Sequence, residues 1–147
     1  MAFEFRLQKV LDYREKQKKM AQEELVLSQI ELQTIQGELV RLEHEEEKLF
    51  QFQRNSQHEN LDALTLFSID NYRLFLQESY EHGLQALAKQ EKEVENRRCE
   101  VVERWRDYKI MGKLKENALN DYAMFEKVQE RNSNDEISLY NYLRKDR

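Results

Sequence analysis

Apolar side chains recur along residues 7–49 at alternating steps of four and three residues. The thirteen positions of this series are Leu7, Leu11, Arg14, Lys18, Ala21, Leu25, Ser28, Leu32, Ile35, Leu39, Leu42, Glu46 and Leu49. Nine of them are apolar. A hydrophobic period of about 3.5 residues, held over this length, is typical of one strand of a left-handed coiled coil. A seam this narrow needs a second helix to cover it, from this chain or from another molecule.

A second series with the same period lies later in the chain. Its positions are Tyr80, Leu84, Leu87, Glu91, Val94, Arg98, Val101, Trp105, Tyr108, Gly112, Lys115, Leu119 and Tyr122, of which nine are apolar. Between the two series, residues 53–62 (QRNSQHENLD) are polar and supply turn and N-cap candidates. We expect the chain to reverse there, with Asn60 or Asp62 starting the second helix. Two matching seams joined by a short polar turn predict an antiparallel helical hairpin.

The predicted fold is all-α: one coiled-coil domain over residues 1–147, built as a long antiparallel two-helix hairpin. We place helix 1 at about 3–52, the turn at 53–62, helix 2 at about 63–131, and a short C-terminal tail at 132–147 after the NSN sequence. The tail either adds a short amphipathic turn or frays. A turn centred near residues 57 and 58 brings together positions whose numbers sum to about 115. Leu7 then lies near Tyr108, Ala21 near Val94, and Leu42 near Arg73. Helix 2 outruns helix 1 and overhangs it.

Composition agrees with long helices. The 147 residues include 36% charged residues, no proline and three glycines, which is unusual for folds rich in tight turns. The net charge of −5 gives no reason to expect nucleic acid as a partner. No apolar run approaches the length of a transmembrane segment, no leader resembles a signal peptide, and Cys99 is the one cysteine. These features predict a soluble cytosolic protein.

Charge is unevenly distributed along the chain. The first twenty residues hold six Lys and Arg against three Asp and Glu, whereas residues 23–47 hold eight acidic residues against Arg41 alone. The acidic block is either a solvated helix face or a means of partner selection. The predicted register puts Arg14, Lys18 and Arg98 at one height in the seam, where like charges would strain the pairing. Either these side chains reach out to glutamates, or they form a docking surface for an acidic partner.

The turn end is crowded with apolar side chains. They are Leu49, Phe50, Phe52, Leu61, Leu64, Leu66, Phe67, Tyr72, Leu74, Phe75 and Leu76. Three consecutive residues on a helix point about 100° apart, so Leu74, Phe75 and Leu76 cannot all face one seam. This end is either a small local core or an exposed aromatic patch for binding.

The sequence lacks the motifs of common catalytic and cofactor sites. No Gly-rich loop followed by Lys-Ser or Lys-Thr is present, and none of His44, His58 and His82 follows a glutamate by three residues as in di-iron bundles. Cys99 has no base beside it in sequence, and Trp105 and Tyr108 are expected in the core. We therefore expect no enzyme activity, no cofactor and no metal.

Three segments resemble a known family. The opening FEFRLQKVLDYREKQ, the sequence NYRLFLQ at residues 71–77 and the late DEISLYNY resemble FliJ, the cytoplasmic flagellar export protein of bacteria. The resemblance covers essentially the entire chain. It implies a non-catalytic stalk protein of the flagellar type III export apparatus, with an antiparallel coiled coil like the central stalk of rotary ATP synthases.

The resemblance also implies partners and a location. Family members are taken to insert into the hexameric ring of the export ATPase, FliI, to contact the export gate protein FlhA, and to escort export chaperones. The location implied is the cytoplasmic face of the membrane at the flagellar base, with a role in motility and chemotaxis.

Candidate binding residues follow from mapping these contacts onto the chain. For the ATPase ring, the candidates at the open end are Arg14, Lys18, Arg104 and Arg106. For the export gate, the matching positions are Leu42, Leu49, Phe75 and Leu76. Glu45 stands where an aromatic residue is expected in the family pattern.

A second class of function is compatible with the same seams. The chain would then be a structural coiled-coil scaffold that self-associates in the cytosol. Sedimentation separates the two classes, because a stalk is expected to be a single elongated chain.

Overall fold

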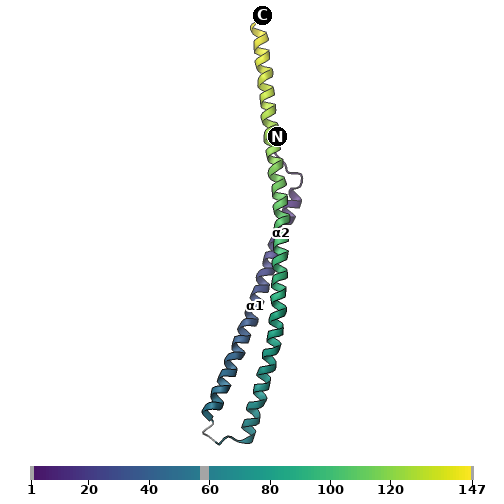
Figure 1. The fold of residues 1–147 in the computed structure, drawn as a ribbon. Coiled ribbons are helices and arrows are strands. Elements are labelled where there is room, and N and C mark those ends of the chain that lie inside the picture. The colour runs from purple at the N-terminus through teal and green to yellow at the C-terminus, as the bar shows by residue number, and fades with distance from the viewer. Residues whose placement is uncertain (1, 57–59, 147) are drawn as a thin grey trace. The chain divides into compact units, whose positions relative to one another are not determined.

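The computed structural model describes residues 2–56 and 60–146. This part of the chain consists of two α-helices without a strand: α1, Gln8–Ser56, with 49 residues, and α2, Ala63–Lys145, with 83 residues (Figure 1). The predicted all-α class is therefore confirmed. The predicted turn centre at residues 57 and 58 lies outside the described residues.

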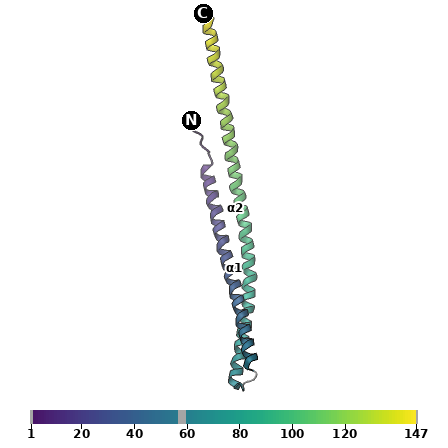
Figure 2. The same cartoon turned by 90° about the vertical axis from the view of Figure 1, so that its left-hand side faces the viewer.

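The chain forms two compact units, Ala21–Val101 and Met1–Met20 with Val102–Arg147. Within the first unit, α1 and α2 run antiparallel and contact each other, as the bonds Glu43–Tyr80 and Ser28–Gln90 demonstrate (Figures 1 and 2). Within the second, the start of α1 packs against α2 through Arg14 and Asp107. The antiparallel pairing is thus confirmed within each unit, and a single domain over residues 1–147 stays a prediction.

The seam of α1 is where the periodicity places it. Leu11, Ala21, Ser28 and Leu39 are only 4–8% exposed. The remaining predicted seam positions are half-buried, except for Leu7 and Glu46, which are exposed. The alternating pattern of α1 therefore predicts its packing face correctly.

The seam of α2 differs from the prediction at alternate positions. Five predicted seam residues are exposed, namely Leu84, Glu91, Arg98, Trp105 and Leu119. The residue just before each of them is half-buried instead, so that Gly83, Gln90, Arg97, Arg104 and Ala118 belong to the seam.

Gly83 supplies a physical reason for this shift. A Cβ atom on Gly83 would lie 2.5 Å from Cδ2 of Leu39, which is 7% exposed. The missing side chain allows Leu39 of α1 to approach the α2 backbone closely. The helices therefore meet at a glycine rather than at the more hydrophobic Leu84.

The register also differs from the predicted sum of about 115. In the ion pairs Arg14–Asp107 and Glu24–Arg97, the two residue numbers sum to 121. Lys18, not Leu7, lies at Tyr108, and Arg73 donates to Gln53 rather than lying near Leu42. The cause is that α1 continues to Ser56 instead of ending at about residue 52, which moves the reversal later in the chain.

Asp62 is the N-cap of α2, and it is one of the two residues predicted to start the second helix. Its backbone carbonyl accepts a hydrogen bond from the Leu66 N–H at 3.1 Å, the first bond of the helix. The predicted start of α1 at residue 3 is wrong, because α1 begins at Gln8 after a turn in which Phe5 O accepts from Gln8 N at 3.0 Å. The preceding Phe3 ring lies 5.5 Å from the Tyr122 ring of α2.

The predicted helix end at residues 132–134 is also wrong, because α2 continues to Lys145. Asn and Ser lower helix propensity only by tenths of a kcal/mol, and no proline or glycine follows to interrupt the hydrogen bonds of the helix. The predicted overhang is confirmed and is longer than expected. Residues 123–145, here called the overhang, are exposed throughout and form the yellow end of α2 in Figure 1.

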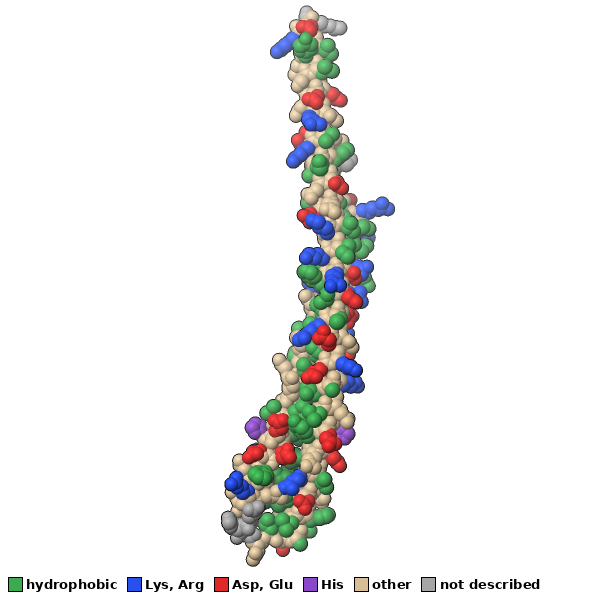
Figure 3. Space-filling view, viewed as in Figure 1, with side chains coloured by type: hydrophobic (Ala, Val, Ile, Leu, Met, Phe, Trp, Pro, Cys, Tyr) green, Lys and Arg blue, Asp and Glu red, His purple; other side chains and the backbone are tan. Residues whose placement is uncertain are grey.

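The crowded turn end is largely an exposed patch. Phe50, Phe52, Leu64, Phe67 and Leu74 are each 51–76% exposed, and green side chains gather at the lower end of Figure 3. Leu76, at 3%, is the exception among the three consecutive apolar residues. Of the two alternatives for this end, the structure supports the patch.

Candidate functional site

Two of the four basic candidates are engaged inside the unit that contains them. The Arg14 guanidinium donates to the Asp107 carboxylate at 3.0 Å, and the Lys18 ammonium lies 4.1 Å from the centre of the Tyr108 ring. Both basic side chains are half-buried. They stabilise the pairing of α1 and α2 as well as presenting positive charge.

The other two basic candidates lie on different faces of α2. Arg104 is half-buried in the seam, whereas Arg106 is exposed. Residues two apart on a helix point about 200° apart. Arg104 therefore shares a side with Arg14 and Lys18, and Arg106 does not.

The predicted charge strain in the seam is wrong. Arg97, not Arg98, occupies the seam, and its guanidinium contacts Glu24 at 2.7 Å, Glu93 at 2.9 Å and Glu100 at 3.3 Å. Burial lowers the pKa of Arg97, but Glu24 and Glu93 outweigh it, so the pKa is raised above the ordinary value. Arg14, Lys18 and Arg97 thus each have an anionic or aromatic partner, which agrees with the first of the two alternatives for these cations.

A groove between α1 and α2 lies in the Ala21–Val101 unit. Its α1 wall is formed by Thr34, Ile35, Glu38, Leu39, Arg41 and Leu42. Its α2 wall is formed by Tyr72, Phe75, Leu76, Ser79, His82, Gly83 and Ala86. The groove therefore has an apolar floor and polar or charged edges, which is the composition of a surface that binds a partner helix or peptide.

Three of the four gate candidates line this groove. Phe75 is 60% exposed, Leu42 is half-buried, and Leu76 is 3% exposed on the floor. Leu49 is half-buried but is not part of the groove wall. The structure thus brings together Leu42, Phe75 and Leu76 and leaves Leu49 apart.

Tyr72 is a residue of this site that the periodicity did not single out. Its ring stacks on Phe75 with centroids 6.4 Å apart, and its hydroxyl donates to the Glu45 carboxylate at 3.2 Å. The Lys48 ammonium contacts the other oxygen of Glu45 at 3.3 Å. Hydrogen bonds from Lys48 and then Tyr72 lower the pKa of Glu45, and desolvation followed by the bond to Glu45 raises that of Tyr72. The acidic residue in place of the expected aromatic one therefore orients Tyr72 at the groove.

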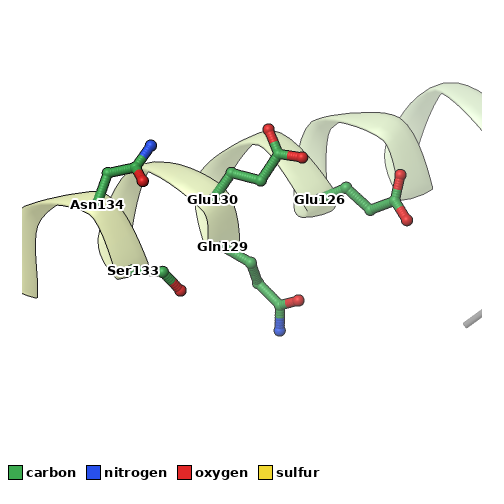
Figure 4. Close-up of a pocket in the computed structure, with 5 residues that line it drawn as sticks. All are labelled: Glu126, Gln129, Glu130, Ser133 and Asn134. Atoms are coloured by element: carbon green, nitrogen blue, oxygen red, sulfur yellow. The ribbon is translucent and has the colours of Figure 1, made fainter. Parts of the chain in front are cut away.

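A further hollow, along the overhang, has no second element to close it. Glu126, Gln129, Glu130, Ser133 and Asn134 project from successive turns of one helix, as Figure 4 shows. Over the residues that the structure describes, no three His, Cys, Asp or Glu side chains gather where they could hold a metal ion. Neither described helix is long and apolar enough to cross a membrane.

Together, the paired helices, the groove and the exposed aromatic patch define an all-α coiled-coil protein with exposed apolar surfaces. The family model described as flagellar FliJ protein matches residues 3–147. The chain belongs to the flagellar FliJ protein family, and its role is in flagellar protein export. Neither the curated proteins nor the solved structures gave a match.

Proposed function

We propose that this protein is a non-catalytic stalk of the flagellar type III export apparatus. It binds the hexameric ring of the export ATPase, promotes ATP hydrolysis there, and contacts the export gate protein. It works with export chaperones at the cytoplasmic face of the membrane at the flagellar base, and so serves motility and chemotaxis. The family match over residues 3–147 is the observation that carries this proposal.

The ring-binding part of the proposal is supported by the overhang. Residues 123–145 continue α2 beyond the Phe3–Tyr122 contact and are exposed on every side. A single exposed helix can enter a narrow central hole that a helix pair would fill. Arg14 and Lys18 follow Phe3 in the chain, and Arg104 and Arg106 precede Tyr122. Arg106 is the most accessible of the four to acidic ring residues.

The gate-binding part is supported by the groove. Phe75 and Tyr72 are exposed by 60% and 40% while their neighbour Leu76 anchors α2 in the seam. An exposed aromatic pair above an apolar floor matches the composition of binding hot spots. Leu42 and Leu76 then shape the floor, and Phe75 makes the direct contact.

ATP hydrolysis by the cognate export ATPase, with and without the full-length protein, tests the proposal. We expect faster hydrolysis and co-elution of the two proteins. The charge reversal Arg106→Glu should weaken both effects, whereas Lys92→Glu, at an exposed cation of α2 in the Ala21–Val101 unit, serves as a control. Absence of both stimulation and co-elution for the wild type would rule out the ring-binding role.

A further inference from the structure

The C-terminal part of α2 carries a second stripe of side chains, separate from the seam that faces α1. With about 100° of rotation per residue, twelve residues between Ile110 and Leu143 fall within a sector about 100° wide, and all twelve are exposed. The seam residues Met111, Ala118 and Tyr122 lie about 100° further round the helix and are half-buried. The stripe, which lies wholly within the unit that contains the overhang, is therefore a distinct face of α2.

Three apolar groups make up most of the stripe, and each side chain is 45–67% exposed. The first group is Ile110 and Leu114. The central group is Met124, Phe125 and Val128. The last group is Leu139, Tyr142 and Leu143.

Two polar pairs separate the apolar groups. Asn117 and Asp121 lie before the central group, and Asn132 and Asp135 lie after it. Apart from the adjacent residues Met124–Phe125 and Tyr142–Leu143, successive positions lie three or four residues apart, as in a coiled-coil strand. An exposed seam with this period requires a partner helix of the same periodicity.

Ten of the twelve stripe residues form five pairs whose residue numbers have a nearly constant sum. Ile110 matches Leu143, Leu114 matches Leu139, and Val128 matches Phe125, each with numbers that sum to 253. The polar positions obey the same rule, since Asp121 and Asn132 sum to 253 and Asn117 and Asp135 sum to 252. Apolar residues match apolar residues, and each amide matches a carboxylate.

We propose that two copies of this chain pair antiparallel along the stripe, about a two-fold axis at residues 126 and 127. A two-fold interface must be self-complementary, because residue i of one copy meets residue j of the other and the reverse. Ten of the twelve stripe residues satisfy this condition, whereas Met124 and Tyr142 have no stripe residue opposite them. The dimer covers the apolar groups that the single chain exposes.

The polar pairs select the antiparallel direction. In that direction the Asn132 amide of one copy can donate to the Asp121 carboxylate of the other, and Asn117 faces Asp135 in the same way. A parallel, in-register pair would instead place Asp121 of one copy against Asp121 of the other. The two Asp135 side chains would face each other in the same way. Like carboxylates at facing seam positions repel each other, so that arrangement is disfavoured.

The flanks of the stripe are compatible with this pairing. On this flank, Lys113 and Ser138 have numbers that sum to 251, as do Arg131 and Asn120, so each cation lies near an uncharged residue of the other copy. No cation on this flank then faces a second cation. Because four of the twelve positions are polar, the dimer is a weak and reversible one.

The dimer and the proposed ring-bound state use the same overhang and so exclude each other. Self-pairing would shield the exposed apolar groups while the protein is free. The dimer inference rests on the stripe alone, however, and its test contains no other protein. It can therefore fail while ring binding holds, or hold while ring binding fails.

Sedimentation equilibrium of the full-length protein over a concentration series tests the pairing. We expect an elongated monomer at low concentration and a dimer only at high concentration for the wild type, because the pairing is weak and a stalk binds the ring as a single chain. Val128→Asp should weaken dimerisation by about tenfold or more, because it places a carboxylate against Met124 and Phe125 of the other copy. Ile137→Asp is the matched control, since Ile137 is 58% exposed but lies on the opposite side of the overhang from the stripe, and it should leave dimerisation unchanged.

Asn132→Lys tests the direction of pairing. In the antiparallel dimer the new ammonium meets Asp121 of the other copy, so dimerisation should tighten. In a parallel dimer the two introduced cations would face each other, and dimerisation would weaken. A wild type that stays monomeric at every concentration, a Val128→Asp variant that dimerises like the wild type, or a weakened Asn132→Lys variant would each overturn the proposal.

Discussion

Arg97 illustrates how a charged side chain is accommodated in a coiled-coil seam. Its guanidinium bridges the two helices of its unit through Glu24 and also bonds Glu93 and Glu100 on its own helix. The side chain is 34% exposed, so the aliphatic stem lies in the seam while the charged head reaches the carboxylates at its edge. Arg98, the next residue, has a single partner, Glu95, at 3.6 Å.

These two arginines give a matched pair of variants. Arg97→Ala should lower the free energy of unfolding, because it removes three ionic contacts and leaves three carboxylates together. Arg98→Ala should change it by less than about 0.5 kcal/mol. Denaturant unfolding followed by circular dichroism measures both, and equal effects would contradict the assignment of Arg97 to the seam.

The pKa of Glu45 tests the contact that orients Tyr72. Its pKa is lowered in the folded protein from an ordinary value of 4.5, first by Lys48 and then by Tyr72. A group with a lowered folded pKa stabilises the fold at pH values above its unfolded pKa. That contribution is lost as the pH falls below about 4.5, through the folded pKa.

Titration by NMR should place the Glu45 pKa below 4.5 in the wild type and closer to 4.5 in Tyr72→Phe. Lys48→Met should raise it further, since Lys48 is the larger cause. Tyr80→Phe, which removes a hydroxyl bonded to Glu43, is the control and should leave the Glu45 pKa as it is. An unaltered Glu45 pKa in Tyr72→Phe would show that Tyr72 is not bound there.

At the scale of the helices, periodicity predicts α1 better than α2. In α1 the stripe of apolar positions at steps of four and three is the packing face. In α2 a second phase, including Leu84, Trp105 and Leu119, is more hydrophobic than the true seam of Gly83 and Arg104. Hydrophobicity alone cannot distinguish these phases, because the choice depends on where the α1 side chains fit.

Glycine substitutions measure that fit directly. Nothing lies within 4 Å of a Cβ at Gly37, so Gly37→Ala should stabilise the protein by about 0.5–1 kcal/mol through helix propensity. Gly83→Ala makes the same gain but places a Cβ 2.5 Å from Leu39 Cδ2. We expect it to be at least about 1 kcal/mol less stable than Gly37→Ala. Thermal or denaturant unfolding that gives the two variants equal stability would contradict the close approach at Gly83.

The sequence predicted only part of the candidate site, because the site depends on how the side chains of the two helices fit together. Leu42, Phe75 and Leu76 meet in the groove because residues on facing helices near the turn must lie close together. The partners of Arg14, Lys18 and Tyr72 depend on register, and the register followed from helix ends that polar residues mark only loosely. The continuous helix through residues 132–134 has the same origin, since Asn and Ser permit a helix end without enforcing one.

At the scale of the whole molecule, the side chains that pack the helices together are largely different from the apolar side chains that are exposed for binding. Few large side chains are fully buried, and many apolar ones remain exposed in three places: the patch at the turn end, the groove, and the stripe of α2. Apolar surfaces of this kind mark sites of protein association. A member of the flagellar FliJ family with these surfaces is suited to joining other components of the export apparatus.

Affinity purification of the full-length protein from its native cells, with identification of the proteins that accompany it, tests this account most directly. We expect the export ATPase and the export gate protein to be recovered with the wild type. Phe75→Ala should lose the gate protein and keep the ATPase, whereas Leu27→Ala, 61% exposed but outside the groove and the turn-end patch, should keep both. Recovery of neither the ATPase nor the gate protein with the wild type would contradict the account.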